Sequence, residues 1–418
     1  MNTDVKFYMD TNIGAPALSD SWGSIIDVLD ACLVDGFGAQ VVSSLTADGK
    51  TATVTFGTAH KFLQHQVIKI TGANQAEFNG EYRIQEVPTD STLVLELNTI
   101  PSTSTATGAI SCSLPPLGWQ KKFTATHKAV YKMQNGLDPM FLRVDASLPD
   151  GYTPTWAKTA KITVSDGMSD IDTFTGNQMP FDASNPDLNH VFSNNRNGWF
   201  KWPYSVQRSI NYGVPKNFFI ETEGGKSAAT RWLVVGSDDL FYIIPRIQTY
   251  NDVVHIFGFG KVKNLVNNTD NYALWVSGYS NTVSQQVYYQ NIDALGGNDT
   301  LQPNCYLFFD KDGMPNYKRV QHFTTSLIQS GLSKGFYTTT GIDSGVVNVL
   351  RPYSETGVYF SFDVIGFSES LPAFKLPHIK GMAQVGSQFN ILADGFVSIR
   401  TVERSAGQSS YLVNVLEK

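Results

Sequence analysis

The chain has 418 residues, of which 16% are charged and 12% aromatic, with a formal net charge of −6 at pH 7. This length predicts about two or three domains. The mild negative charge argues against a nucleic-acid partner, because such binding depends on clustered Lys and Arg side chains that neutralise phosphates.

Residues 1–38 are predicted to form an N-terminal arm followed by a helix. The arm is an extended segment interrupted by turn residues, at Lys6-Phe7-Tyr8, Gly14-Ala15-Pro16 and Ser21-Trp22-Gly23. We expect it to be exposed and to serve equally well as an arm that lies on a neighbouring subunit. Residues 1–10 contain acids and no apolar run of signal-peptide length, so we expect no secretory signal.

The clearest helix signal in the chain covers residues 24–38. Its apolar residues recur at three- and four-residue steps and share one broad face, formed by Ile25, Ile26, Val28, Leu29, Cys32 and Leu33. Ser24 is the expected N-cap, with Asp27 in the capping-box position. Asp35-Gly36 is the expected stop. We expect the apolar face of this helix to dock on a β-domain.

Residues 39–114 are predicted to form a small β-barrel or β-sandwich domain inserted after the helix. Thr51–Phe56 alternates with period two. Asn79-Gly80 is a hairpin-turn signal between Ala76–Phe78 and residues 81–84. The remaining strands are expected at residues 41–45, 67–70, 91–97 and 106–113. The composition, rich in Gly, Tyr and Phe, favours β-structure with many turns.

Residues 115–418 are predicted to form one large antiparallel β-sandwich-type domain, entered at Pro115-Pro116. The whole chain is therefore expected to be mainly β. Strands are expected at residues 129–132, 141–144, 161–164, 231–235, 240–244, 253–257, 273–276, 305–309, 346–350, 358–362 and 396–402. One short helix is expected at residues 323–330.

The three cysteines, Cys32, Cys112 and Cys305, are far apart and form no CxxC pair. We expect buried free thiols in a protein made in a reducing cytoplasm. No window approaches the ~20 apolar residues that a membrane-spanning helix needs, so no membrane partner is expected.

Two acidic segments are the first candidates for a metal site. Asp166, Asp170 and Asp172 lie close together, but their spacing matches no calcium loop, so a solvated turn is the favoured interpretation. Asp310-Lys311-Asp312-Gly313 resembles the start of a calcium loop. Met314 and Gln321 stand where that loop needs oxygen ligands, so a hairpin turn is favoured there.

Other catalytic patterns are incomplete. His60 and His65 form the closest histidine pair, and no third metal ligand can be assigned. The chain has no Gly-x-Ser-x-Gly elbow and no phosphate-binding loop, and Gly258-Phe259-Gly260 is interpreted as a bulge or tight turn. No pair of acids can be singled out for glycoside hydrolysis. We therefore expect no catalytic residue, no metal ligand and no cofactor.

The densest aromatic segment is Trp199-Phe200-Lys201-Trp202-Pro203-Tyr204, which follows an Asn-rich run at residues 194–198. Exposed aromatic side chains flanked by amides suit sugar stacking or a protein interface. Packing in a core or between domains is the alternative interpretation.

Three parts of the sequence carry a resemblance to known proteins. The first is the arm and helix, with Lys6-Phe7-Tyr8, Gly14-Ala15-Pro16 and Leu29-Asp30-Ala31-Cys32-Leu33-Val34-Asp35-Gly36-Phe37-Gly38. The second is the small domain and its exit, with His60-Lys61-Phe62, Ile70-Thr71-Gly72-Ala73, Phe78-Asn79-Gly80-Glu81-Tyr82, Ala106-Thr107-Gly108, Pro116-Leu117-Gly118-Trp119 and Lys128-Ala129-Val130-Tyr131. The third is more diffuse, with Leu142-Arg143-Val144-Asp145, Arg231-Trp232, Phe241-Tyr242, Phe257-Gly258-Phe259-Gly260 and Tyr272-Ala273.

Together these segments resemble a family of virion structural proteins of tailed bacteriophages. The resemblance implies a non-enzymatic particle component that assembles in several copies with other virion proteins, in the neck, tail, baseplate or capsid surface. It supplies no catalytic residues. Few charges and many polar and aromatic residues suit the large interfaces of such a protein. The expected location is the virion, after synthesis in the host bacterial cytoplasm.

The expected contact residues are large aromatics in Gly- and Asn-rich surroundings, namely Phe7, Tyr8, Trp22, Trp199, Phe200 and Trp202. The first hypothesis is a self-associating structural subunit of the particle. The alternative is a module that binds host-surface glycans on a stacking platform at residues 199–204. A third hypothesis, an envelope depolymerase or lysin, needs two carboxylates or a His-bound metal that the sequence does not identify.

Overall fold

The computed structural model describes side chains in most of the chain up to Val276 and strand pairing beyond it. The described residues are 2–134, 140–176, 178–179, 201–206, 218–220, 224–225, 228–246, 257–263, 270–276, 288–290, 305–311, 314–324, 348–352, 374–375, 379–383, 390–391, 396–404 and 407–414. Strands account for 53% of them, which confirms the mainly β prediction. Among these residues, no helix has both the length and the apolar character needed to cross a membrane.

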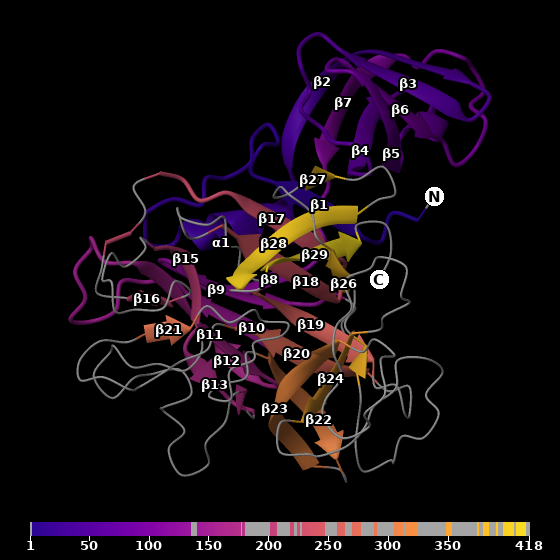
Figure 1. The fold of residues 1–418 in the computed structure, drawn as a ribbon. Coiled ribbons are helices and arrows are strands. Elements are labelled where there is room, and N and C mark those ends of the chain that lie inside the picture. Colours follow the sequence, from indigo (N-terminus) through magenta and orange to yellow (C-terminus); the bar gives the residue numbers. More distant parts are fainter. Residues whose placement is uncertain are drawn as a thin grey trace.

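Six antiparallel strands close into a barrel, one of the two architectures that the sequence predicts for this region (Figure 1). Going round the barrel they are β2 (Phe37–Asp48), β3 (Thr51–Phe56), β6 (Thr92–Glu96), β5 (Gly80–Thr89), β4 (Val67–Ala73) and β7 (Gly108–Leu114). Alternation places apolar side chains in the interior, where Leu45, Val54, Ile68 and Leu95 have no exposed surface.

The predicted strand at Ala76–Phe78 is wrong, because these residues form a short 3₁₀ helix, η2. The side chain of Asn79 replaces the missing strand partner. Its amide nitrogen donates to the carbonyl of Ala73 at 2.8 Å, and its amide oxygen accepts from the backbone N–H of Ala73 at 3.0 Å. The backbone N–H and carbonyl of Ala73, at the end of β4, thus have a side chain as their partner. The strand β5 begins only at Gly80.

The predicted helix is present as α1 (Ser24–Leu29), continued by a π-helix, η1 (Asp30–Asp35). Ser24 is not its N-cap. The hydroxyl of Ser24 donates to the carbonyl of Ser19 at 2.9 Å, and Gly23 precedes the helix with φ +90°. The predicted stop is confirmed, since η1 ends before Gly36 in a positive-φ conformation.

The π-helix is tied to the segment that leaves the barrel. The N–H of Leu117 donates to the carbonyl of Cys32 at 2.9 Å, and the N–H of Trp119 donates to that of Leu33, also at 2.9 Å. Carbonyls at the end of the helix thus find partners outside it. As a result, the entry to the barrel at Phe37 and its exit at Leu114 are held together at one end.

The largest sheet has nine antiparallel strands (Figure 1). In order they are β1 (Lys6–Met9), β17 (Trp232–Gly236), β18 (Leu240–Pro245), β19 (Phe257–Lys263), β20 (Asp270–Trp275), β22 (Cys305–Lys311), β23 (Met314–Thr324), β24 (Asn348–Pro352) and β25 (Phe374–Lys375).

A second sheet has β14 (Gln178–Met179), β11 (Lys158–Ser165), β10 (Phe141–Asp145), β9 (Lys128–Lys132) and β8 (Gln120–Ala125), with β15 (Lys201–Ser205) also paired to β11. The two sheets contribute to one buried cluster, in which Leu142 and Ile162 of the second sheet join Phe241 and Leu274 of the first. This shared core fits the predicted sandwich-type packing.

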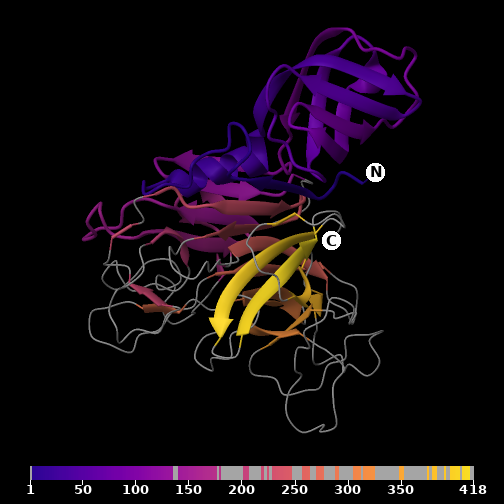
Figure 2. The same ribbon diagram turned by 45° about the horizontal axis from the view of Figure 1, so that its top comes forward.

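The smaller pairings complete the described fold. They are β12 (Met168–Asp170) with β13 (Thr173–Phe174), β16 (Phe218–Ile220) with β21 (Tyr288–Gln290), and a sheet of β26 (Ile379–Ala383), β29 (Gly407–Asn414), β28 (Phe396–Arg404) and β27 (Asn390–Ile391). Figure 2 shows the barrel projecting from one end of the layered sheets, with the helix lying along the same side.

Most strands predicted after the barrel are present, with two corrections. Phe323 and Thr324 belong to β23 and pair with β24, so the helix predicted at 323–330 is wrong where it begins. Gly258 and Gly260 form neither a bulge nor a turn, because β19 pairs continuously with both neighbours. A Cβ on Gly258 would clash with the carbonyl oxygen of Phe241, so this glycine permits a close backbone approach. Residues 253–256, 325–330 and 358–362 lie outside the described residues.

Candidate functional site

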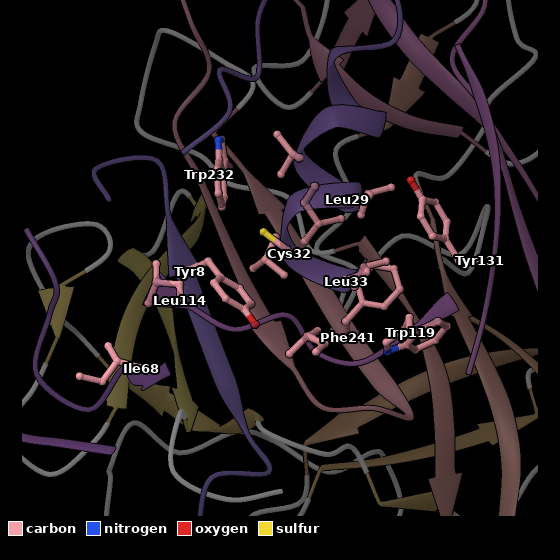
Figure 3. Packing of buried hydrophobic residues seen from close by; sticks show 14 of the residues in the cluster. Tyr8, Leu29, Cys32, Leu33, Ile68, Leu114, Trp119, Tyr131, Trp232 and Phe241 are labelled. Carbon is pink, nitrogen blue, oxygen red and sulfur yellow. The ribbon is translucent and has the colours of Figure 1, made fainter. Parts of the chain in front are cut away.

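The N-terminal arm is buried in the chain's own fold, so the expectation that Phe7 and Tyr8 are exposed is wrong. Phe7 is 1% and Tyr8 0% exposed, and both lie in β1 at the edge of the nine-stranded sheet. The Tyr8 hydroxyl donates to the carbonyl of Pro115 at 2.6 Å. Figure 3 shows Tyr8 among buried side chains that include Cys32 of the helix. Phe7 and Tyr8 therefore pack within their own chain, and their role in contacts between subunits stays a prediction.

Trp22 is the one predicted contact residue that is described and remains partly exposed. Its ring lies beneath the Lys158 ammonium, which is 5.5 Å from the ring centroid. The indole nitrogen is buried and has no hydrogen-bond partner among the described residues. Its contact role stays a prediction.

The aromatic segment is core where the structure describes it, so the expected exposure of Trp202 is wrong. Trp202 has no exposed surface, and its indole N–H donates to the carbonyl of Trp275 at 2.7 Å. Its ring packs against Phe241 and Phe257, with centroid distances of 6.1 and 6.3 Å. Tyr204 is also buried.

Packing, one of the two interpretations of this segment, is therefore confirmed for Trp202 and Tyr204. Neither ring can serve as a glycan-stacking platform. Trp199 and Phe200 lie outside the described residues.

The best-organised polar site joins the arm to the barrel. Arg83 in β5 is 5% exposed and donates to backbone carbonyls of both the arm and the barrel. Its Nε and Nη2 atoms donate to Asn2 at 2.9 and 2.8 Å, Nη2 also donates to Val5 at 2.9 Å, and Nη1 donates to His65 at 2.7 Å. Burial lowers the pKa of Arg83 to about 10. The guanidinium stays protonated at neutral pH and fastens the arm to the barrel.

Two buried amides extend this junction. The Gln66 side chain, in the barrel, donates to the carbonyl of Phe7 at 3.1 Å. Its amide also exchanges hydrogen bonds with the Asn12 side chain, at 2.9 and 3.0 Å. Asn12 in turn accepts from the backbone N–H of Met9 at 2.9 Å. These contacts satisfy buried polar groups on both sides of the junction.

A cleft of about 510 Å³ opens beside this junction, between the arm, the barrel and the turn after β17. Its lining includes Asp4, Lys6, Glu81 and Asp238. Lys6 is paired with Glu81 at 2.8 Å and also donates to the carbonyl of Pro116 at 2.7 Å. The cleft is therefore polar, and its one lysine is engaged within the chain.

The two acidic segments considered for a metal site make ion pairs or flank paired strands in the structure. Asp172 pairs with Lys128 at 2.9 Å and with Arg143, so it fastens the β12–β13 hairpin to the sheet. Lys311 of β22 pairs with Met314 of β23 in an antiparallel register, as a hairpin requires. Asp312 and Gly313, where the turn is predicted, lie outside the described residues. No group of three or more His, Cys, Asp or Glu residues suited to a metal ion occurs in the described part of the chain.

His60 and Cys32 serve in packing. His60 is 1% exposed, accepts from the N–H of Phe62 at 2.9 Å, and stacks on the Phe62 ring. Cys32 and Cys112 are buried free thiols, as predicted, and burial raises the pKa of both. The side chain of Cys305 is not among those described.

A buried ion network in the second sheet is centred on Asp145. Lys161 lies 3.1 Å and Arg143 3.3 Å from its carboxylate, and Ser147 donates to it through backbone and hydroxyl. Burial alone would raise the pKa of Asp145. The two cations and the Ser147 hydrogen bonds outweigh burial and lower this pKa to about 2.

We expect Asp145 to stabilise the folded chain by ~2 kcal/mol above pH 4, because its pKa is lower in the folded than in the unfolded state. This contribution should disappear as the pH falls from about 4 towards 2. Urea unfolding of the wild type and Asp145→Asn across this range measures it. The stability difference between the two proteins should shrink with falling pH, and a constant difference would contradict the assignment.

The sequence did not single out Arg83, Gln66 or Asn12. For Arg83 the sequence contains a weak signal, because this charged residue stands between the strand residues Tyr82 and Ile84. A charged side chain that becomes buried in a strand needs polar partners. Nothing local marks Gln66 or Asn12, whose mutual contact joins positions 54 residues apart. Comparison with known proteins adds no assignment, because no family model, curated protein or solved structure matches the chain.

Proposed function

We propose that the chain is a non-enzymatic structural component of a tailed-bacteriophage virion and works through contacts with copies of itself and with other virion proteins. The observation that carries the proposal is the fixed attachment of a closed barrel to a large β-body. Arg83, Gln66 and Tyr8 reach across this junction with buried hydrogen bonds. A β-structure whose parts are joined by buried hydrogen bonds suits a protein that presents surfaces in defined relative positions.

The use of buried charge supports the same proposal. Lys158 pairs with Asp20 at 2.7 Å, Arg143 with Asp145 and Asp172, and Arg83 with the arm. Each of these buried cations is engaged with groups of its own chain. Their described contacts hold segments together, as expected for a scaffold.

The test is to look for the chain in purified particles. We expect mass spectrometry of gradient-purified phage to detect it at a fixed copy number per particle, and immunogold labelling to place it at one position. Light scattering coupled to gel filtration of the purified chain separates a ring-sized oligomer from a monomer that other virion proteins recruit. Absence of the chain from intact, infectious particles would contradict the proposal.

A further inference from the structure

The outward edge of β1 carries a regular set of backbone groups. Within β1, which pairs antiparallel with β17, Lys6 and Tyr8 alternate with Phe7 and Met9, and Val5 directly precedes the strand. The carbonyls of Val5 and Phe7 and the N–H of Met9 accept or donate hydrogen bonds away from β17. In an antiparallel ladder, alternate residues direct their groups to the next strand position. Here no strand of the described fold occupies that position.

Side chains take the place of the missing strand. Arg83 donates to Val5 at 2.9 Å and Gln66 donates to Phe7 at 3.1 Å, both from the barrel. Asn12, held by Gln66, accepts from Met9 at 2.9 Å. Each residue whose backbone groups point away from β17 thus has a polar side chain hydrogen-bonded to its backbone. Two of these three polar side chains come from the barrel.

An uncovered edge strand is a template for pairing with another chain, and proteins commonly cover such edges. We propose that the barrel is an edge cap, which keeps the nine-stranded sheet from pairing through β1 with β1 of a second copy of this chain. An antiparallel β1–β1 pair about a twofold axis is self-complementary, so one exposed edge suffices for a dimer. The apolar residues Val5, Phe7 and Met9, all buried when capped, would favour that contact.

This inference goes beyond the proposed function, since it concerns a contact that the fold prevents and is independent of any particle. The double substitution Arg83→Met and Gln66→Leu removes the barrel's two donors. Hydrogen exchange of the backbone over residues 2–12, measured in dilute solution, reports whether the edge is uncovered. Light scattering over a concentration series reports association.

We expect faster exchange over residues 2–12 in dilute solution and a mass that about doubles relative to wild type as concentration rises. Adding Met9→Pro removes an outward N–H and should return the mass to the wild-type value. Arg143→Met is the matched control, because Arg143 is equally buried and also donates to a backbone carbonyl, that of Ile171, but lies in the other sheet. It should leave the mass unchanged.

Faster exchange with an unchanged mass would overturn the proposal, because the edge would then be open without pairing. Unchanged exchange would overturn it as well, since the two side chains would not be the cap. If the double variant does not fold, Gln66→Leu alone is measured in the same way, with Arg83 retained, and the same outcomes decide.

Discussion

Trp202→Ala is expected to lower the free energy of unfolding by about 3–5 kcal/mol, the range for deleting a large aromatic side chain from a packed core. The ring has no exposed surface and packs on Phe241 and Phe257. Its removal leaves a cavity between the two sheets and also leaves the carbonyl of Trp275 without its indole donor. Urea unfolding followed by circular dichroism measures the change.

Two variants show whether this loss comes from burial. Trp202→Phe keeps an aromatic ring and loses the hydrogen bond, so a smaller cost of about 1–3 kcal/mol is expected. Trp22→Ala removes a tryptophan that is partly exposed and should cost less than Trp202→Ala. A Trp202→Ala protein with wild-type stability and impaired adsorption to cells would contradict the core role of Trp202 and favour the glycan-binding alternative.

The features predicted correctly from sequence are those set by local periodicity. The three- and four-residue spacing of apolar residues predicted α1 and η1 with their stop at Gly36, and period-two alternation predicted strands such as β3. These patterns record which face of an element is buried, whatever covers it. The small β-domain could be predicted because its short strands are close together in the sequence.

The exposure of single aromatics could not be predicted in the same way. Trp202 bonds a carbonyl 73 residues away, and Tyr204 bonds Ser21, 183 residues away. An Asn-rich run precedes the segment of Trp202, but the covering surface comes from β18 and β19, which its neighbours in sequence do not reveal. The arm was misjudged for the same reason, since the strand that pairs with β1 begins at Trp232.

Tyr8→Ala is expected to cost about 3–5 kcal/mol of stability and to loosen the barrel from the body. Tyr8 is fully buried where the arm, the helix and the barrel exit meet. Its ring lies 5.7 Å from that of Phe37 at the barrel entry, and its hydroxyl bonds Pro115 just after the barrel. Both chain connections to the barrel are therefore contacted by one side chain. Unfolding in urea measures the stability loss.

Limited proteolysis tests whether Tyr8→Ala loosens the barrel from the body. Cleavage is expected near Gly36 and Gly118, the glycines that flank the two chain connections. Tyr8→Phe keeps the ring and removes only the hydroxyl that serves Pro115, so it should cost about 1–2 kcal/mol and leave the connections resistant. If Tyr8→Ala instead keeps wild-type stability and protease resistance, the arm does not hold the barrel. Such a result would favour the exposed arm predicted from sequence.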